Sequence, residues 1–271
     1  MFRSLNTGVS GLQQFQQRID VIGNNIANVG TTGYKSVRAT TSDTFSDTLG
    51  NAVQVGRGVT AGGVSSVFTQ GGLEQTGAPA DLAISGQGFF TVKDTATGVT
   101  YATRDGSFTR TTDGYLVTTG GLRLQGFSDA GLTTRGDVKL DATGAGGALP
   151  GAKVSSFTID EQGKVTVVLD DGSAAFVRGQ VLLQNFTTPQ ALVKEGSNLY
   201  SNLANAGPLA QTAVPGAGGL GTVKSGQLEM SNVDLASEFT NLITSQRGFQ
   251  ANSRIITTSD ELLQEIINLK R

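Results

Sequence analysis

Large apolar side chains recur every seven residues near the C-terminal end of this chain. The repeat consists of Leu235, Leu242, Phe249, Ile256 and Leu263, and Phe239 lies beside it. Seven-residue spacing places such side chains on one stripe of an α-helix, along which helices pack lengthwise. Asp234 stands directly before the repeat, where its carboxylate can accept hydrogen bonds from the first free backbone N–H groups. We therefore predict a long α-helix over residues 232–271.

The N-terminal end carries a weaker repeat of the same kind. Its apolar members are Leu5, Val9, Leu12, Ile19 and Ile26. The pattern stops before Gly30 and Gly33, because glycine readily adopts the backbone conformation that ends a helix. This pattern predicts a second helix over residues 1–30. The two stripes could pair within one chain or with helices of other copies. Association between copies is favoured, because two helices bury only one seam between them.

Between the two ends, the hydrophobic period changes from 3.5 to 2 residues. Val165, Val167 and Leu169 alternate with Lys164 and Thr166, as in a strand with one buried face, although Val168 breaks the strict alternation. Turn pairs such as Asp113-Gly114 divide these runs, which is typical of antiparallel hairpins. The 38 glycines are about twice the usual share, which suits a domain with many tight turns.

The predicted fold class is therefore α+β. The terminal helices are expected to form a coiled-coil-like core domain, and the middle of the chain a mainly antiparallel β domain. The predicted parts are an N-terminal helix (1–30), an extended connector (31–80), a β domain (81–204), a Gly/Pro-rich return linker (205–231) and a C-terminal helix (232–271).

Composition excludes several kinds of site. The chain has no cysteine and no histidine, so disulfides, thiolate nucleophiles and histidine-based catalytic triads are impossible. Its formal net charge is −2, and charged residues make up 15% of the chain, against about 25% in typical domains. That balance argues against a nucleic-acid partner. No apolar run reaches the roughly 20 residues that a transmembrane helix needs.

Two local patterns resemble chemical sites but are better explained as loops and turns. Residues 216–221 read G-x-G-x-x-G, yet a dinucleotide site needs a strand before this motif and a helix after it, whereas Pro215 precedes it. Asp160-Glu161 and Asp170-Asp171 stand at predicted hairpin turns, where Asp is favoured because it bonds nearby backbone N–H groups. We therefore predict no catalytic residue, cofactor, metal ligand or small-molecule substrate.

Both ends of the chain resemble the signatures of a known family. Residues 12–29 (LQQFQQRIDVIGNNIANV) and 32–35 (TGYK) resemble the N-terminal signature of flagellar rod, hook and axial proteins. Residues 226–235 (GQLEMSNVDL) resemble their C-terminal signature. Residues 81–90 and 101–108 are similar to the middle motif of hook and distal-rod subunits. The motif residues carried over from the family are Asn24, Asn25, Asn28, Gly33, Tyr34, Lys35, Asn232 and Asp234.

The resemblance implies a structural subunit and not an enzyme. Residues 230–235 and the final residues 268–271 look most like those of short hook proteins. The implied function is a self-assembling, bendable helical tube that transmits motor torque to the filament. The implied partners are other copies, the flagellar rod, the hook cap, the hook–filament junction proteins and the flagellar export apparatus. The implied location is the hook and basal body, reached by type III export without a cleaved signal peptide.

Three other functions stay open at this point. A distal rod subunit is the nearest alternative, because it shares the same signatures. A secreted β-domain binding module with helical stalks would explain the composition but not the paired terminal signatures. A hydrolase that uses carboxylates alone would need two acidic side chains in a cleft with raised pKa values.

Overall fold

The computed structural model describes residues 2–44, 46–48, 54–56, 58–143, 152–171 and 173–269. The chain divides into two compact units, which are described separately. We call the first the helical unit; it comprises Met1–Val29, Lys35–Val67 and Val233–Arg271. We call the second the β unit; it comprises Gly30–Tyr34 and Phe68–Asn232.

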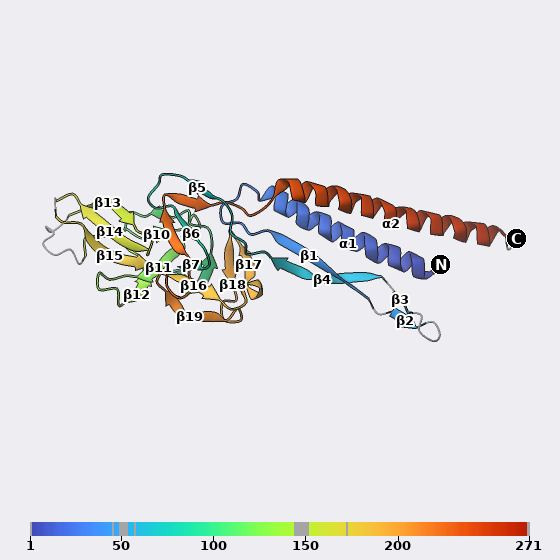
Figure 1. The fold of residues 1–271 in the computed structure, drawn as a ribbon, viewed down its shortest axis with the longest axis horizontal. Helices are drawn as coiled ribbons and strands as arrows, with labels where there is room; N and C mark the ends of the chain where they lie inside the picture. Colours follow the sequence, from blue (N-terminus) through green and yellow to red (C-terminus); the bar gives the residue numbers. More distant parts are fainter. Residues whose placement is uncertain are drawn as a thin grey trace. The chain divides into compact units, whose positions relative to one another are not determined.

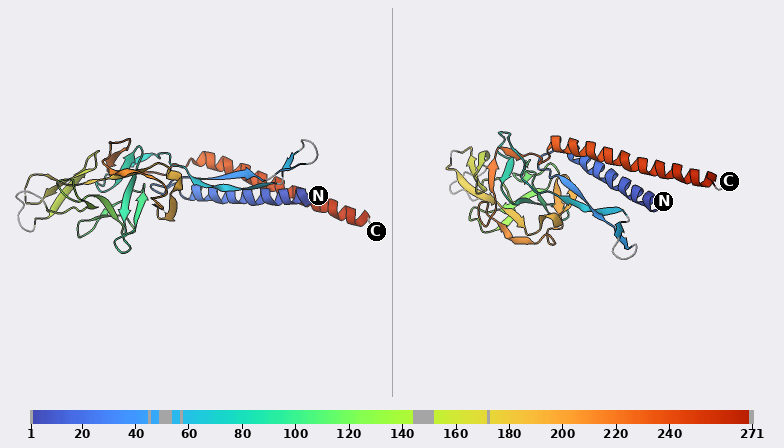
Figure 2. Two further views of the ribbon diagram at one scale, coloured as in Figure 1. Left: turned by 90° about the horizontal axis from the view of Figure 1, so that it is seen from below. Right: turned by 45° about the vertical axis from the view of Figure 1, so that its right-hand side comes forward.

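The helical unit contains two long helices and a two-stranded ribbon. The helices are α1 (Phe2–Ala27) and α2 (Leu235–Leu269). The ribbon pairs β1 (Val37–Asp43) with β4 (Val59–Ser66), and continues as β2 (Ser46–Thr48) paired with β3 (Gln54–Gly56). Helix α1 lies between α2 and the ribbon (Figures 1 and 2). Within this unit, α1 is therefore the central element.

The two helices run antiparallel, and their contacts fix one register. Gly8 lies against Ile256 and Gly11 lies against Asn252. Towards the other end of α1, the side chain of Asn25 donates a hydrogen bond to Glu238 (3.0 Å). Each step forward along α1 is matched by an equal step back along α2. The first residues of α1 and the last residues of α2 therefore lie at the same end of the helix pair (Figure 1).

Helix α2 begins where its sequence supplies a cap. The carboxylate of Asp234 accepts a hydrogen bond from the backbone N–H of Ala236 (2.9 Å), one of the groups that have no partner inside the helix. Glu238 lies in the first turn, where the positive end of the helix dipole favours an acidic side chain. The first turn of α2 is thus stabilised by side chains of its own sequence.

The β unit is built on one large sheet, and every strand pair recorded in it is antiparallel. Its strands are β5 (Leu73–Gln75), β6 (Leu82–Ser85), β7 (Phe89–Lys93), β8 (Thr100–Thr103), β9 (Thr109–Arg110), β10 (Leu116–Val117), β11 (Arg123–Phe127), β12 (Arg135–Asp137), β13 (Val154–Ile159), β14 (Lys164–Leu169), β15 (Phe176–Val181), β16 (Leu183–Phe186), β17 (Val193–Gly196), β18 (Leu199–Ser201), β19 (Pro208–Ala213), β20 (Thr222–Ser225) and β21 (Gln227–Glu229), with a short 3-10 helix η1 (Pro189–Ala191) before β17.

The main path of this sheet runs β13-β14-β15-β11-β7-β8-β18-β17. Strands β16 and β19 join it at β7, and β9, β10 and β12 join it at β11. Two further pairs, β6 with β20 and β5 with β21, bring segments from the two ends of the β unit together. The unit is therefore closed where the chain enters and leaves it.

Two hydrophobic clusters form the core, and both lie in the β unit. The larger cluster comes from strands across the sheet and includes Leu82, Phe90, Val92, Leu124 and Val165. The smaller cluster is aromatic, and its rings meet edge-on or tilted at centroid distances of 5.4–6.0 Å. Its rings are Phe68, Phe89, Phe186 and Tyr200.

The prediction that the terminal helices form a coiled-coil-like core domain is wrong. The described residues do include a helix at each end and a large antiparallel β unit, but the hydrophobic core lies in the β unit. Of the apolar side chains described on α1 and α2, only that of Ile22 is buried, with 4% of its surface exposed. The repeat predicted an apolar seam, but glycine, serine and asparagine occupy much of the contact between the helices, so little apolar area is buried there.

Candidate assembly surface

The predicted stripe residues of the two helices lie at the edges of the helix contact or in solvent. On α1, Val9 is exposed (39%). The remaining members of its stripe are half-buried, namely Leu5, Leu12, Ile19 and Ile26. On α2, Leu235 and Phe239 are exposed (39% and 49%). The remaining members are half-buried, namely Leu242, Phe249, Ile256 and Leu263.

Glycines and polar residues lie in the helix contact, where Gly8 faces Ile256 and Gly248 faces the ring of Phe15. A Cβ atom added to Gly11 would lie 2.9 Å from Nδ2 of Asn252, so a larger residue at this position would have to displace the Asn252 side chain. Gly8 and Ser245 are buried in the same contact. The sequence contained this signal in the glycines at positions 8, 11 and 248, but a search for apolar repeats passes over them.

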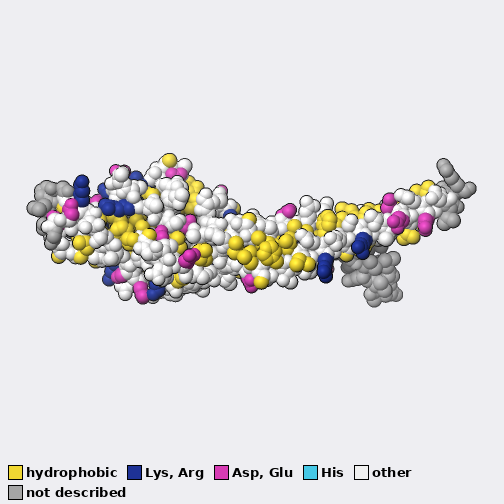
Figure 3. Space-filling view, turned by 90° about the horizontal axis from the view of Figure 1, so that it is seen from above, with side chains coloured by type: hydrophobic (Ala, Val, Ile, Leu, Met, Phe, Trp, Pro, Cys, Tyr) yellow, Lys and Arg dark blue, Asp and Glu magenta, His cyan; other side chains and the backbone are white. Residues whose placement is uncertain are grey.

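Exposed apolar side chains accumulate on α2. In the space-filling view they gather over the first turns of this helix and again further along it (Figure 3). They form one group at the start of the helix and one in its second half. Their members are Leu235, Phe239, Ile243, Ile255, Leu262, Ile266 and Ile267. Clustered apolar surface of this kind marks a protein–protein contact, and we take it as the candidate assembly surface.

Asn25 joins three elements of the helical unit. It is 1% exposed, and its side chain exchanges two hydrogen bonds with the backbone of Val37, each 2.9 Å long. This pairing imitates a neighbouring strand at the start of β1. The same amide nitrogen also donates to Oε1 of Glu238 on α2. The family motif residue Asn25 therefore fixes α1, α2 and the ribbon to one another.

The other motif residues near the end of α1 are also held by hydrogen bonds or buried. The side chain of Asn28 donates to Oδ1 of Asn24 (2.8 Å), one turn earlier. Lys35 is fully buried, at 0% exposure. In the β unit, the side chain of Asn232 donates to Oγ1 of Thr69 (2.8 Å). Asp234 caps α2. These residues all lie close to the start or the end of a helix or strand.

Gly33 and Tyr34 form a tight turn within the β unit. The φ angle of Gly33 is +66°, and a Cβ atom there would lie 2.5 Å from the backbone nitrogen of Asp105, so both conformation and space require glycine. The Gly33 N–H donates to the carbonyl of Glu229 (2.7 Å). Tyr34 is buried, and the ammonium of Lys194 lies 4.4 Å from the centre of its ring. Partial burial lowers the pKa of Lys194 to about 8.

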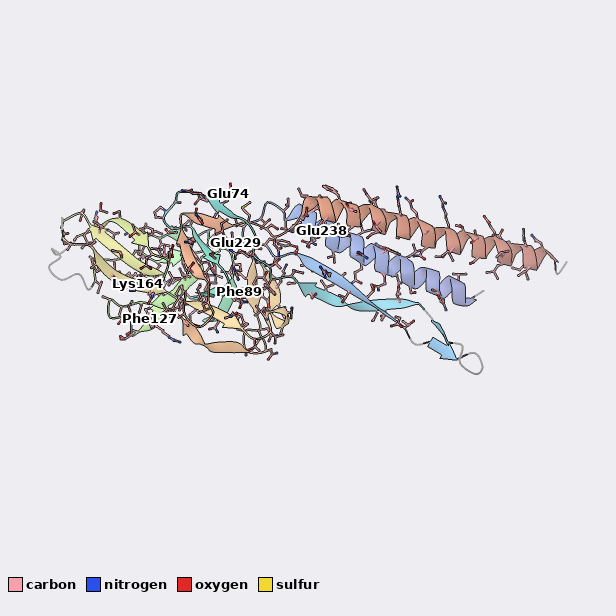
Figure 4. All side chains as sticks on the ribbon, in the orientation of Figure 1. Glu74, Phe89, Phe127, Lys164, Glu229 and Glu238 are labelled. Atoms are coloured by element: carbon pink, nitrogen blue, oxygen red, sulfur yellow. The ribbon has the colours of Figure 1, made fainter. Side chains whose placement is uncertain are left out.

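A buried ion pair lies beside the aromatic cluster. Nη1 of Arg104 lies 3.1 Å from Oε2 of Glu229, and both side chains are almost completely buried. The Arg104 guanidinium also lies over the Phe89 ring, at 5.2 Å, and donates to the Gly86 carbonyl (3.0 Å). Burial lowers the pKa of Arg104, and the Glu229 carboxylate opposes that shift. Figure 4 shows Phe89 and Glu229 in this part of the unit.

Sequence reasoning did not identify this pair. Arg104 and Glu229 both fall inside segments that resemble the family motifs, but 125 residues separate them. Glu229 also accepts a hydrogen bond from the Gly71 backbone N–H (3.0 Å), so it connects the entering and leaving segments of the β unit. A single sequence carries no signal for a pairing of such long range.

The suspected chemical motifs are turns in the structure. The carboxylate of Asp160 accepts backbone N–H bonds from Gln162 and Lys164 (3.0 and 2.8 Å). Residues 216–221 form a turn, and the element that directly follows them is the strand β20 and not a helix. Within the part of the chain that the structure describes, there is no group of three or more residues able to hold a metal ion. No helix of the described residues is long and apolar enough to cross a membrane.

The β unit contains a cavity of about 330 Å³ beside β7, β11 and β16. Its lining includes Thr91, Gln125, Arg135 and Gln184, together with the ring of Phe186. None of the lining residues is acidic, so the paired carboxylates that a carboxylate-based hydrolase requires are not in this cavity.

Three family models match parts of the chain. Residues 5–35 match the model described as "Flagella basal body rod protein". Residues 83–167 match "Flagellar hook protein FlgE/F/G D1 domain", and residues 224–269 match "Flagellar basal body rod FlgEFG protein C-terminal". The three models thus cover both helices and part of the β unit.

Curated relatives align over the full chain. It is 41% identical over 283 residues to the flagellar basal-body rod protein FlgG of Bacillus subtilis, with 100% of both chains covered. It is 34% identical over 293 residues to FlgG of Borreliella burgdorferi, again with 100% of both chains covered. The flagellar hook protein FlgE of Borreliella burgdorferi is 26% identical over 445 residues, with 100% of both chains covered.

Proposed function

The chain belongs to the family of flagellar basal-body rod and hook proteins, and we propose that it is a distal rod subunit. It is a structural component of the bacterial flagellum, in a family of structural and not enzymatic proteins. The observation that carries the finer proposal is the alignment with FlgG proteins along the full length of both chains. The predicted hook function is supported less well, because the alignment with a hook protein extends over 445 positions at lower identity.

The candidate assembly surface supports a polymer of identical subunits. Apolar groups lie at the start and in the second half of α2, so two different patches of one helix are available to neighbours. A contact between different patches of identical copies generates an open helical polymer when its rotation does not close into a ring. The two groups of exposed apolar residues on α2 would become buried in that polymer.

The proposed partners follow from a position in the rod. A distal rod subunit contacts other copies of itself, the rod subunits below it and the hook above it. Delivery through the flagellar export apparatus, without a cleaved signal peptide, is part of the same proposal. A hook subunit, with a hook cap and junction proteins as partners, is the alternative.

Labelled basal bodies would distinguish the rod from the hook. The turn between β7 and β8 is exposed at residues 95–98 and can carry a short epitope tag. We expect gold-labelled antibody on the rod, below the hook, in basal bodies opened by removal of the outer rings. Label along the hook would contradict the rod proposal and favour the hook. Label on neither would contradict both.

A deletion strain gives an independent result. Loss of a distal rod subunit should leave basal bodies with an incomplete rod and no hook. Loss of a hook subunit should instead leave a complete rod without a hook. Expression of the intact chain from a plasmid should restore swimming in either case, and it serves as the control.

A further inference from the structure

The large sheet of the β unit forks at Thr91 of β7. Strand β8 occupies one edge of β7, where Ala102 pairs with Thr91. On the other edge, β11 pairs with residues 92–93 and β16 pairs with residues 89–90, so neither register includes Thr91. Away from β7, β11 pairs with β15 instead. The cavity of about 330 Å³ beside these strands lies at this division of the sheet, and we call it the fork cavity.

Three polar side chains on neighbouring strands line the fork cavity. They are Thr91 on β7, Gln125 on β11 and Gln184 on β16. Their neighbours along the strands belong to the larger core cluster, namely Phe90, Val92, Leu124 and Leu183. Successive side chains of a strand point to opposite faces of the sheet, so the three polar residues share the face that points away from that cluster. Hydrogen-bonding groups therefore gather on one wall of the cavity.

Two of these side chains have hydrogen-bonding capacity that the chain does not use. Thr91 is 4% exposed, and its hydroxyl has no hydrogen-bond partner among the residues that the structure describes. The side-chain nitrogen of Gln125 donates to Oδ1 of Asp137 (2.8 Å) and to the Arg123 carbonyl (3.2 Å), which fixes the amide. Buried polar groups in proteins are nearly always paired, so an unpaired hydroxyl beside a cavity points to a partner outside the chain.

The rest of the lining restricts the chemistry of a ligand. Among the described residues that line the cavity none is acidic, which disfavours a metal ion or another cation. Arg135 is the single charged residue among them and is exposed, which is too little positive charge for a polyanion. Leu182 and Phe186 are buried and supply an apolar wall. The cavity therefore suits an uncharged ligand that carries hydroxyl or amide groups and a small apolar group.

The size of the cavity favours a ligand of one ring. Pockets for small molecules span roughly 300–1,000 Å³, so this cavity is at the small end of the range. A sugar ring presents hydroxyl groups around its edge, which can pair with threonine and glutamine side chains. An N-acetyl substituent adds an amide and a methyl group, and the methyl group matches the apolar wall.

We propose that the fork cavity binds one N-acetylhexosamine unit. A free sugar and the end of a glycan chain present the same ring, and the experiment below distinguishes these two sources. The cavity belongs to the β unit, whereas the candidate assembly surface belongs to α2 in the helical unit. This inference therefore does not rest on the proposed rod function.

Saturation-transfer NMR on the purified full chain tests the binding directly. N-acetylglucosamine is the probe, and glucose, which lacks the N-acetyl group, is the matched control ligand. We expect a dissociation constant on the order of 1 mM for N-acetylglucosamine, and binding of glucose that is weaker by roughly fivefold or more. The strongest transfer should reach the methyl protons, because they would lie against the apolar wall. Binding of the N-acetylglucosamine trimer would identify a glycan end as the source, and its exclusion would identify the free sugar.

Two variants test whether the sugar occupies the fork cavity. Thr91→Val replaces the unpartnered hydroxyl by a methyl group, so it should weaken binding about fivefold without lowering the thermal midpoint of the chain. Thr100→Trp places a large ring on an exposed lining residue and should abolish binding. Thr158→Val is the matched control, because Thr158 is exposed on β13 and does not line the cavity.

Several results would overturn the inference. Absence of saturation transfer to N-acetylglucosamine would exclude the binding. Equal transfer to glucose would exclude the selection of the N-acetyl group. Unchanged binding in both Thr91→Val and Thr100→Trp would exclude the fork cavity as the site. The proposed rod function would survive each of these results, because labelled basal bodies test it separately.

Discussion

Single residues fix the places where the chain passes from one element to the next, and their polar groups form hydrogen bonds there. The side-chain amide of Asn25 donates hydrogen bonds to β1 and to α2. The backbone of Gly33 packs closely against the backbone of Asp105. The resemblance singled out both residues, yet it gave no physical reason for them. The reason is geometric: an amide can imitate a strand partner, and glycine alone fits the space. The Arg104–Glu229 pair has a comparable role and could not be predicted, because only the fold brings its members together.

Removal of the buried carboxylate should destabilise the β unit. Glu229→Gln leaves the Arg104 guanidinium buried without its counter-charge, which costs about 3–5 kcal/mol in comparable buried pairs. Urea unfolding of the purified chain, followed by tyrosine fluorescence, measures this cost. Lys224→Gln is the matched control, because it removes a partly exposed pair with Glu161 and should change the midpoint little. Equal midpoints for both variants would contradict the importance of the buried pair.

The pKa of Lys194 predicts a pH dependence with a definite sign. This pKa falls from 10.5 to about 8 on folding, because partial burial disfavours the charged form. Between pH 8 and 10.5 the unfolded chain therefore binds a proton that the folded chain has lost. The contribution of Lys194 to the free energy of unfolding should increase with pH through this window.

The variant Lys194→Met isolates this contribution. Unfolding midpoints of the native chain, measured in urea from pH 7.5 to 10, should rise relative to those of the variant as pH increases. Other groups titrate equally in both chains, so the difference between the two series reports on Lys194. A difference that stays constant with pH would exclude the proposed shift.

At the scale of elements, the hydrophobic period indicated where helices and strands occur but not which faces pack. The predicted stripe of α1 contained Val9, whereas its buried positions include Gly8 and Gly11. A repeat of apolar residues identifies a surface that avoids water, and that surface can face a partner molecule. Small residues identify the surface on which backbones come close. For this helix pair, the second signal decides the packing.

Substitution at the close approach should separate the helices. Gly11→Leu places a branched side chain against Asn252, where a Cβ atom alone would come within 2.9 Å. We expect a lower thermal midpoint for helix unfolding and faster proteolysis of α1. Gly23→Ala is the matched control on the same helix, because nothing lies within 4 Å of its added Cβ atom. That control should stabilise the helix by up to about 1 kcal/mol.

At the scale of the whole molecule, the exposed apolar residues of α2 and the core of the β unit have different functions. The core stabilises one chain, and the exposed residues are available to other chains. The low share of charged residues, 15%, fits this division, because few charges need to be desolvated when copies pack together. The choice between rod and hook could not be predicted, because the motif segments are shared by both classes.

Polar substitution at the start of α2 should impair assembly without unfolding the subunit. Leu235→Ser and Phe239→Ser together remove exposed apolar area from the candidate assembly surface. We expect smaller swimming halos and fewer complete rods, with an unchanged circular dichroism spectrum. Val99→Ser is the control, since Val99 is similarly exposed (45%) but belongs to the β unit. Normal swimming in the double variant would show that this part of α2 faces no neighbour.

The pairing of β5 with β21 has a consequence for how such genes can change. These strands pair residues 73–75 with residues 227–229, so the segment between them begins and ends at one strand pair. An insertion within this segment would enlarge the β unit, while the sequences of α1 and α2 on either side of it would stay unchanged. Selection can thus alter the β unit and retain the two terminal helices.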